Sequence, residues 1–153
     1  MSFEHDLWRG RKGEELFEKA TKANGVNMTS VTEDGKYQKN DIDYVSSCCG
    51  CGWEVKTDYM AHNTGNLALE SHTSTQGDSW LWKSKADLFA FVIPQTGEIY
   101  GIEAYKLRMY CRKEPLRHVR KYDNGKDIEL ILLPFDKYRE AFVPLGVNEK
   151  KCA

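Results

Sequence analysis

The stretch Asp87–Ile93, which reads Asp-Leu-Phe-Ala-Phe-Val-Ile, constrains the fold more than any other part of the chain. Six consecutive apolar residues, without the polar alternation of a half-exposed strand, predict a strand that is buried on both faces. Such a strand lies inside a sheet that has other layers packed on both sides. Helical and strand-like patterns alternate around it. Their order predicts an α/β (α+β) fold with a central mixed sheet of four to five strands, flanked by helices.

Apolar spacing and turn residues predict the other elements. An apolar stripe at i, i+1, i+4 and i+7 predicts a helix from about Gly13 to Asn24, which Gly25 ends. The Ser/Thr/Gly-rich residues 71–79 are expected to form a loop. Further strands are expected at residues 26–31, 42–46, 53–59, 66–70, 99–103 and 128–133, and helices at 105–112 and 135–142.

Length and composition indicate one globular domain that spans the whole chain, residues 1–153. Apolar residues make up 41% of the sequence, and no apolar run approaches the roughly 18 residues of a membrane span. The first residues lack a basic segment followed by an apolar one, so we expect no secretory signal and no membrane partner. Five cysteines, an odd number, then favour reduced thiols and a cytoplasmic location.

The segment from Asp43 to Lys56 carries the most informative chemistry. It predicts two strands joined by a tight turn, Cys-Cys-Gly-Cys-Gly, and the second strand contains Glu54-Val-Lys56. Residues two apart share a strand face, so Glu54 and Lys56 point the same way. Carboxylate oxygens are the ligands that Mg²⁺ prefers, and a lysine beside them can meet a phosphate. The alternative is a charged, solvent-facing pair on a surface hairpin.

Three elements of the sequence together resemble a known family. The segment Arg-Lys-Gly-Glu14 to Gly25 resembles the opening helix of archaeal Holliday-junction resolvases and their small bacterial relatives. Ile42-Asp43 and Glu54-Val-Lys56 are similar to the Asp…Glu-x-Lys core of the PD-(D/E)XK, or restriction-endonuclease-like, nuclease superfamily. Residues 64–70 and 82–91 are similar to segments of its small phage-type members. The family's proline before the aspartate is replaced by Ile42.

The resemblance implies a restriction-endonuclease-like core and a Mg²⁺-dependent DNA endonuclease, with Mn²⁺ as a substitute and branched DNA as a candidate substrate. Asp43, Glu54 and the Val55 carbonyl would ligate the metal, and Lys56 would position or deprotonate the attacking water. Both carboxylates are expected at strand ends on a solvent-reachable face. Glu14 would hold a metal-bound water, although helical periodicity does not choose between Glu14 and Glu15.

Two other acidic residues near this motif leave alternatives open. Glu70 is either a further metal ligand on a neighbouring strand or an exposed strand-end carboxylate. Asp41 shares the strand face of Asp43, but its place near the loop favours a turn residue.

Net charge is −1, yet residues 106–121 hold seven basic residues against one acidic residue. Such a patch is the footprint of a phosphate backbone, or else a solvated helix face. Lys83 and Lys85 are either phosphate contacts or edge charges that discourage strand pairing. The residues expected to contact DNA are Lys83, Lys85, Lys106, Arg108, Arg112, Lys113, Arg117 and Arg120. Cleavage of both strands of a symmetric DNA favours a homodimer.

The cysteine turn supports a separate hypothesis. Cys48, Cys49 and Cys51 crowd one turn, and Cys111 would be the fourth thiolate of a zinc site. The cluster lacks the paired Cys-x₂₋₄-Cys spacing of structural zinc sites, which disfavours zinc. Two functions therefore compete with the nuclease: a catalytically inactive nucleic-acid-binding protein of the same fold, and a zinc-stabilised interaction domain.

Overall fold

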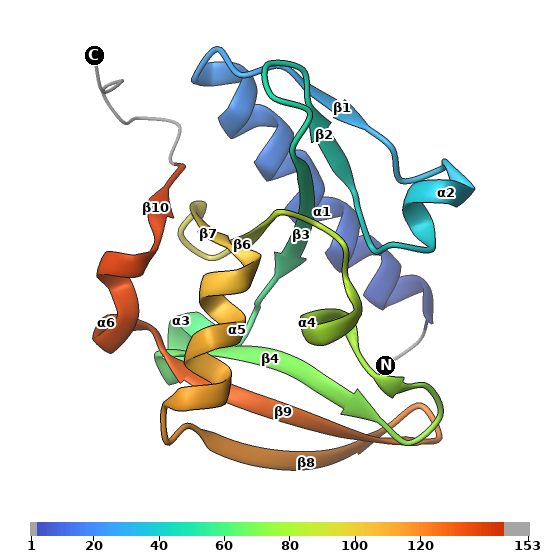
Figure 1. The fold of residues 1–153 in the computed structure, drawn as a ribbon, viewed down its shortest axis with the longest axis vertical. Coiled ribbons are helices and arrows are strands. Elements are labelled where there is room, and N and C mark those ends of the chain that lie inside the picture. The colour runs from blue at the N-terminus through green and yellow to red at the C-terminus, as the bar shows by residue number, and fades with distance from the viewer. Residues whose placement is uncertain (1–2, 146–153) are drawn as a thin grey trace.

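The computed structural model describes residues 3–145. Within these residues, two sheets and six α-helices make up the fold (Figure 1). The helical elements are α1 (Phe3–Ala23), α2 (Gly35–Gln38), α3 (Ala61–Thr64), α4 (Trp80–Lys83), α5 (Ala104–Lys113), α6 (Phe135–Tyr138) and a 3₁₀ turn, η1 (Arg139–Ala141). The strands are β1 (Met28–Ser30), β2 (Tyr44–Ser46), β3 (Gly52–Thr57), β4 (Asn66–Thr73), β5 (Gly77–Asp78), β6 (Leu88–Ile93), β7 (Glu98–Glu103), β8 (Arg117–Asp123), β9 (Lys126–Pro134) and β10 (Val143–Pro144).

The first sheet has six strands in the order β1-β2-β3-β6-β7-β10. Strands β3 and β6 are parallel and all other neighbours are antiparallel, so the sheet is mixed. Strand β6 lies inside the sheet, and five of its six residues are buried. The predicted fold class and the buried central strand are therefore confirmed, although the sheet is larger than the four to five strands expected.

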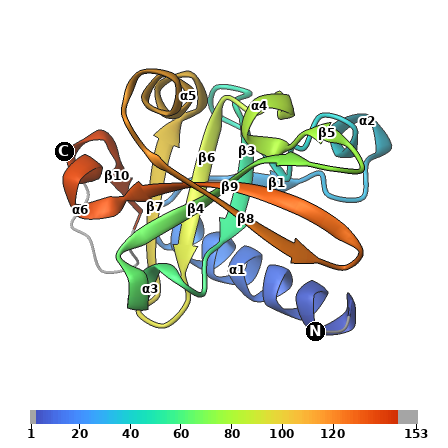
Figure 2. The same ribbon diagram turned by 90° about the horizontal axis from the view of Figure 1, so that it is seen from below.

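A second sheet, β5-β4-β9-β8, was not predicted. Strand β4 continues to Thr73 and β5 follows at Gly77–Asp78, so the prediction of a plain loop over residues 71–79 was wrong. The error has a physical cause. Pairing of β4 with β9 and of β5 with β4, and not apolar content, holds these polar residues in strands. Seen from below, β4, β8 and β9 cross in front of the first sheet (Figure 2).

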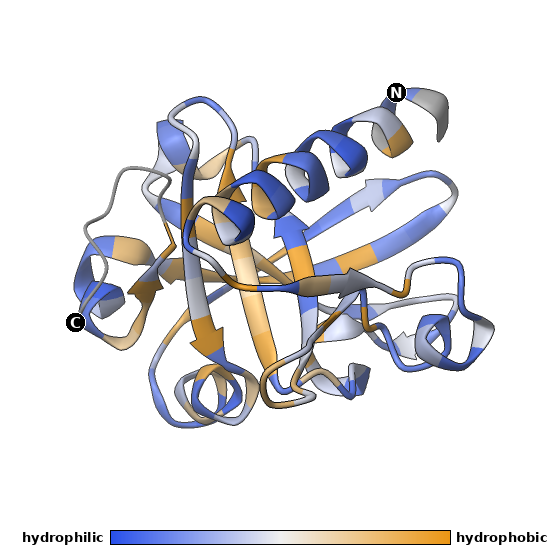
Figure 3. Ribbon diagram, turned by 90° about the horizontal axis from the view of Figure 1, so that it is seen from above, coloured by the Kyte–Doolittle hydropathy of each residue, from blue (hydrophilic) through white to orange (hydrophobic). Residues whose placement is uncertain are grey.

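Two apolar clusters hold the layers together. Phe17 and Ala20 of α1 pack on Val55, Ala90 and Val92 of the first sheet. A larger cluster on the opposite face of that sheet joins β6 and β7 to β4, β9 and α5. Hydrophobic residues accordingly concentrate in the central strands, whereas α1 presents a largely hydrophilic surface (Figure 3). The first sheet is thus covered on both faces.

Helix α1 begins ten residues before the predicted start and approaches β3 very closely. Gly13 is buried, and a Cβ atom at this position would come within 1.6 Å of Thr57 Oγ1. Only a residue without a side chain fits at this crossing. A hydrogen bond of 2.6 Å from the Tyr44 hydroxyl to Glu18 Oε1 further ties α1 to β2. These contacts fix the position of Glu14, the next residue of the helix.

Within residues 3–145, no helix is both long and apolar enough to cross a membrane.

Candidate active site on β3

The β2–β3 hairpin places Asp43 against the middle of β3. The Asp43 N–H donates to the Trp53 carbonyl, and Asp43 Oδ2 accepts a hydrogen bond from the Val55 N–H, both at 2.8 Å. Asp43 is the residue just before β2. Its carboxylate accepts the Val55 N–H, which a backbone carbonyl of a neighbouring strand would otherwise accept. Because the N–H and C=O of one strand residue point to the same side, the Val55 carbonyl also points toward Asp43.

Glu54 and Lys56 share a face of β3, as predicted, and form an ion pair. Lys56 Nζ lies 2.6 Å from Glu54 Oε1 and 4.8 Å from the centroid of the Trp80 ring. The expectation that both carboxylates lie at strand ends on a solvent-reachable face was wrong for Glu54. Glu54 occupies the middle of β3 and is 4% exposed, because the second layer covers this face.

Burial and mutual repulsion disfavour the charged form of the clustered carboxyl groups. Burial raises the pKa of Glu54 to about 7, and Asp43 adds to the rise while Lys56 opposes it. Burial also raises the pKa of Asp43, against the hydrogen bond from Val55 and the charge of Lys56. Two carboxyl groups whose ionisation is hindered in this way favour a nearby cation.

Glu14, and not Glu15, turns toward these groups. Burial and the negative charge of Asp43 raise the pKa of Glu14, which is half-buried, whereas Glu15 is exposed on the outer side of α1. The contact between Gly13 and Thr57 sets this rotation of the helix. The structure thus distinguishes two neighbours that helical periodicity could not.

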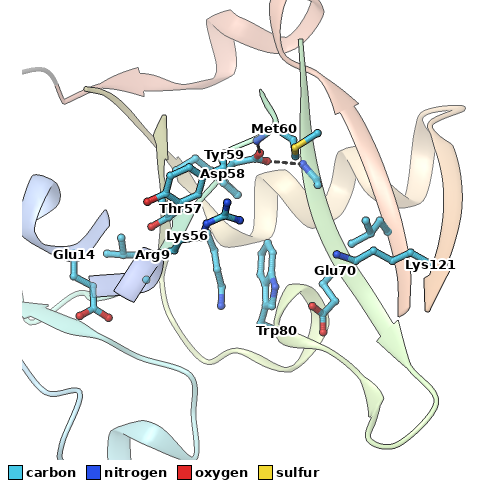
Figure 4. Close-up of a pocket in the computed structure, with 15 residues that line it drawn as sticks. Arg9, Glu14, Lys56, Thr57, Asp58, Tyr59, Met60, Glu70, Trp80 and Lys121 are labelled. Atoms are coloured by element: carbon cyan, nitrogen blue, oxygen red, sulfur yellow. Dashed lines mark hydrogen bonds between the residues drawn. The ribbon is translucent and has the colours of Figure 1, made fainter. Parts of the chain in front are cut away.

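A pocket of about 420 Å³ opens beside the ion pair. Glu14, Val55 and Lys56 line it, whereas Asp43 and Glu54 are not among its lining residues. Figure 4 shows Lys56 and Trp80 side by side, with Glu14 on one side and Glu70 and Lys121 on the other. The pocket is therefore bounded by α1, β3 and the second sheet, and its basic residues come from all three: Arg9, Lys56 and Lys121.

Glu70 lines the pocket from β4, apart from the Asp43–Glu54 pair. Its Oε1 atom accepts a hydrogen bond of 2.8 Å from the Ser79 hydroxyl. Figure 4 places the Trp80 ring between Lys56 and Glu70. The structure therefore does not bring Glu70 together with the other predicted ligands, and Glu70 serves instead to hold the turn before α4.

Asp41 lies in a turn, yet it is close enough to Asp43 and Glu54 to influence their ionisation. Its backbone has φ 51, the left-handed conformation typical of turns. Its charge raises the pKa of both Asp43 and Glu54. Asp41 is thus both the turn residue that the sequence favoured and a neighbour of the site.

The predicted DNA-binding residues form three groups, on α5, on β8 and at the end of α4. Helix α5 carries four of them, and Arg108 is partly committed to the fold, because its Nε and Nη2 atoms each donate at 2.6 Å to the Leu81 and Ser84 carbonyls. Arg112 lies 4.9 Å above the Trp82 ring. Strand β8 carries Arg117 and Arg120, which are exposed, as are Lys83 and Lys85 beside α4.

Three buried side-chain oxygens in residues 3–145 lack a hydrogen-bond partner, and all belong to the site or its pocket. They are Asp41 Oδ2, Glu54 Oε2 and the Tyr59 hydroxyl. Buried polar atoms normally have hydrogen-bond partners, so these unpartnered oxygens fit a cation beside Asp43 and Glu54. Over the described part of the chain, no three His, Cys, Asp or Glu side chains converge as a complete metal cage. Mg²⁺ usually needs only one or two protein carboxylates, with waters and substrate phosphates as its other ligands, so this donor set fits it.

Arg9, Tyr59, Trp80 and Lys121 also line the pocket but were not among the predicted site residues. Arg9 stacks over the Tyr59 ring at 4.6 Å. The available signal was helical spacing, because Arg9 and Gly13 are four residues apart and share a helix face. Lys121 belongs to the basic segment, but the direction of its side chain depends on β8, a strand that was not predicted from the sequence.

The cysteines do not form the four-thiolate set considered above. Cys48 and Cys49 are exposed in the β2–β3 turn, whereas Cys111 is buried in the apolar cluster under α5. Burial raises the pKa of Cys111 to about 11, so this thiol stays protonated.

Comparison of the chain with protein-family models, curated proteins and solved structures finds no match.

Proposed function

We propose that the protein is a metal-dependent endonuclease that hydrolyses phosphodiester bonds in DNA. The observation that carries the proposal is the vacant Oε2 of buried Glu54, next to Asp43 and to the Lys56 ammonium at 2.6 Å from Oε1. These buried carboxyl groups ionise readily only beside a cation, so they suit a divalent metal. Lys56 and the other basic residues of the pocket suit a phosphate.

Asp43, Glu54 and the Val55 carbonyl would hold Mg²⁺, and Mn²⁺ would substitute for it. A bound divalent ion at this position would polarise the scissile phosphate and favour ionisation of water. Lys56 is already oriented by Glu54 and Trp80 and would stabilise charge on the phosphate oxygens. Glu14 would accept a hydrogen bond from the attacking water at the mouth of the pocket.

The pocket suits a nucleic-acid backbone better than a small apolar ligand. Arg9 and Lys121 stand on opposite walls, on α1 and β8, so both can contact phosphates on either side of the scissile one. Binding would therefore depend strongly on salt.

The test is a cleavage assay on linear, nicked, flapped and four-way DNA, with Mg²⁺, Mn²⁺ or EDTA. We expect cleavage with either metal and none with EDTA. Asp43→Asn keeps an acceptor for the Val55 N–H but loses the negative charge, so it should cut at least about 100-fold more slowly and remain folded. Glu15→Gln, one residue from Glu14 but exposed, is the matched control and should cut normally.

Two outcomes would contradict the proposal. The first is DNA binding without cleavage of any substrate in Mg²⁺ or Mn²⁺, which favours the inactive nucleic-acid-binding protein. The second is cleavage that persists in EDTA and in Asp43→Asn. The molecular mass in solution, with and without DNA, tests the expected homodimer.

A further inference from the structure

The turn between β2 and β3 brings two thiols into direct contact. The Cys49 and Cys51 sulfur atoms share a hydrogen bond of 2.8 Å, about 0.8 Å longer than a disulfide bond. Gly50, between them, has φ 70 and donates its N–H to the Ser46 carbonyl at 2.8 Å. The left-handed glycine folds the chain so that the side chains on either side of it meet. Little backbone movement separates this arrangement from a bonded pair.

The surroundings make one of the two thiols the nucleophile. Hydrogen bonding with Cys51 and then with Ser46, whose hydroxyl is 2.9 Å from the Cys49 sulfur, lowers the pKa of Cys49 to about 7. The same pairing raises the pKa of Cys51 to about 11. Cys49 is exposed, so a molecule in solution can reach it. Neither Cys49, Cys51 nor Ser46 has a role in the proposed nuclease chemistry.

We propose that Cys49 and Cys51 form a redox-active dithiol that exchanges with small-molecule disulfides of the glutathione type. Cys49 is the attacking thiol and Cys51 is the resolving thiol. The two carboxylates of the candidate active site lie on the strands that this turn joins, but the exchange itself requires neither them nor a metal. The inference is thus independent of the proposed nuclease function.

The exchange proceeds in two displacements. The Cys49 thiolate attacks one sulfur of the small disulfide, which forms a mixed disulfide and releases one small thiolate that takes a proton from water. Cys51 then loses its proton to solvent and attacks the Cys49 sulfur, which releases the second small thiol. The two cysteines are oxidised to an intra-turn disulfide, and the small disulfide is reduced to two thiols.

The sulfur contact favours exchange over a thiolate metal site. Cys48 also hydrogen-bonds to Cys49, but only as a minor influence on its pKa. No three of these sulfur atoms, nor any with His, Asp or Glu, converge on a metal position within residues 3–145. A pair in contact is the arrangement that disulfide formation needs.

The experiment uses the full chain with Cys152, which lies outside the described residues, replaced by Ser in every variant. Protein is incubated with oxidised glutathione, remaining thiols are blocked by acid quenching and alkylation, and peptides are identified by mass spectrometry. The parent protein should lose two hydrogen atoms and yield a Cys49–Cys51 disulfide. Cys51→Ser should stop at the mixed disulfide on Cys49, and Cys48→Ser, the matched control, should form the disulfide like the parent.

The rate of the first step adds a quantitative check. At pH 7 a thiol of pKa about 7 is half ionised, against about 3% for an ordinary thiol of pKa about 8.5, while its lower nucleophilicity offsets part of the gain. The net advantage is about threefold, and we expect Cys48→Ser, which keeps Cys49 and Cys51 in contact, to react with oxidised glutathione faster than an unstructured cysteine peptide by this order. A reaction no faster than that of the peptide, or a disulfide that includes Cys48 in the parent, would overturn the proposal.

Discussion

Lys56 Nζ lies 2.6 Å from Glu54 Oε1, and this ion pair is at the centre of the candidate active site. Glu54 is 4% exposed and its Oε2 atom has no partner, so the lysine satisfies only half of a buried carboxylate. Breaking a buried pair usually costs more than the pair contributes to stability. A buried carboxylate with one unsatisfied oxygen is therefore better explained by function than by stability. It leads to predictions about the stability of the fold and about cleavage.

The raised pKa of Glu54 predicts a pH-dependent stability. A carboxyl group with a folded pKa of about 7, above its ordinary 4.5, stabilises the fold fully below pH 4.5 and loses this contribution as the pH rises through 7. Glu54→Gln does not ionise, so its stability relative to wild type should increase by about 3 kcal/mol between pH 4.5 and 8. Urea unfolding at the two pH values measures this difference. Exposed Glu15→Gln is the control. A stability difference between Glu54→Gln and wild type that is the same at both pH values would contradict the account.

The close approach of Gly13 to Thr57 predicts a large effect of one methyl group. Gly13→Ala would place Cβ 1.6 Å from Thr57 Oγ1, so α1 must shift and stability should fall by about 1–3 kcal/mol. Gly10→Ala, in the same helix with nothing within 4 Å of the added atom, should gain up to about 1 kcal/mol from helix propensity. Chemical denaturation compares the two variants.

The Gly13 prediction extends to Glu14, the residue that follows it. Cleavage by Gly13→Ala should fall, and Thr57→Ala in the same protein should recover part of the lost stability by removing the hydroxyl. Equal stability of Gly13→Ala and Gly10→Ala would show that α1 does not pack on β3 as described.

The basic residues of α5 and β8 should supply affinity and not chemistry. Charge reversal at Arg112 and Arg117 should weaken binding to all DNA sequences about equally, because phosphate contacts carry no sequence information. The slope of log K against log salt should become shallower by about 2 for the double variant. Fluorescence anisotropy over a salt series gives this slope. Lys36→Glu on α2, far from α5 in both ribbon views, is the control, and an unchanged slope in the Arg112/Arg117 variant would mean that this segment is only solvated.

The sequence predicted the first layer of the fold better than the second. Apolar periodicity predicted β6 and the second half of α1, because the buried residues of these segments form a pattern in their own sequence. Strand β8, Arg-His-Val-Arg-Lys-Tyr-Asp, lies at the edge of the second sheet and has no buried residue, so it gives no apolar pattern. A usable signal was nevertheless present, because Asn124 and Gly125, with φ 50 and 77, form the Asn-Gly turn that typically joins two hairpin strands.

The candidate site shows the same division. The face shared by Glu54 and Lys56 follows from strand periodicity alone. The burial of Glu54 does not, because it arises from α4 and the second sheet, which pack on that face through pairings distant in sequence. The position of Glu70 behind Trp80 likewise depends on where β4 lies, which local patterns do not determine.

The most direct test of the proposed function is the cleavage rate of Lys56→Met. Methionine keeps an unbranched apolar side chain beside Trp80 but lacks the ammonium. The variant should fold with some loss of stability, because buried Glu54 loses its partner, and saturating Mg²⁺ should still bind while charge stabilisation at the phosphate is lost. Lys36→Met, at an exposed position of α2, is the matched control. Under single-turnover conditions with Mg²⁺, Lys56→Met should bind DNA with near-normal affinity and cut at least about 100-fold more slowly, a barrier increase of roughly 2.7 kcal/mol. Cleavage by Lys56→Met at the wild-type rate would contradict the account.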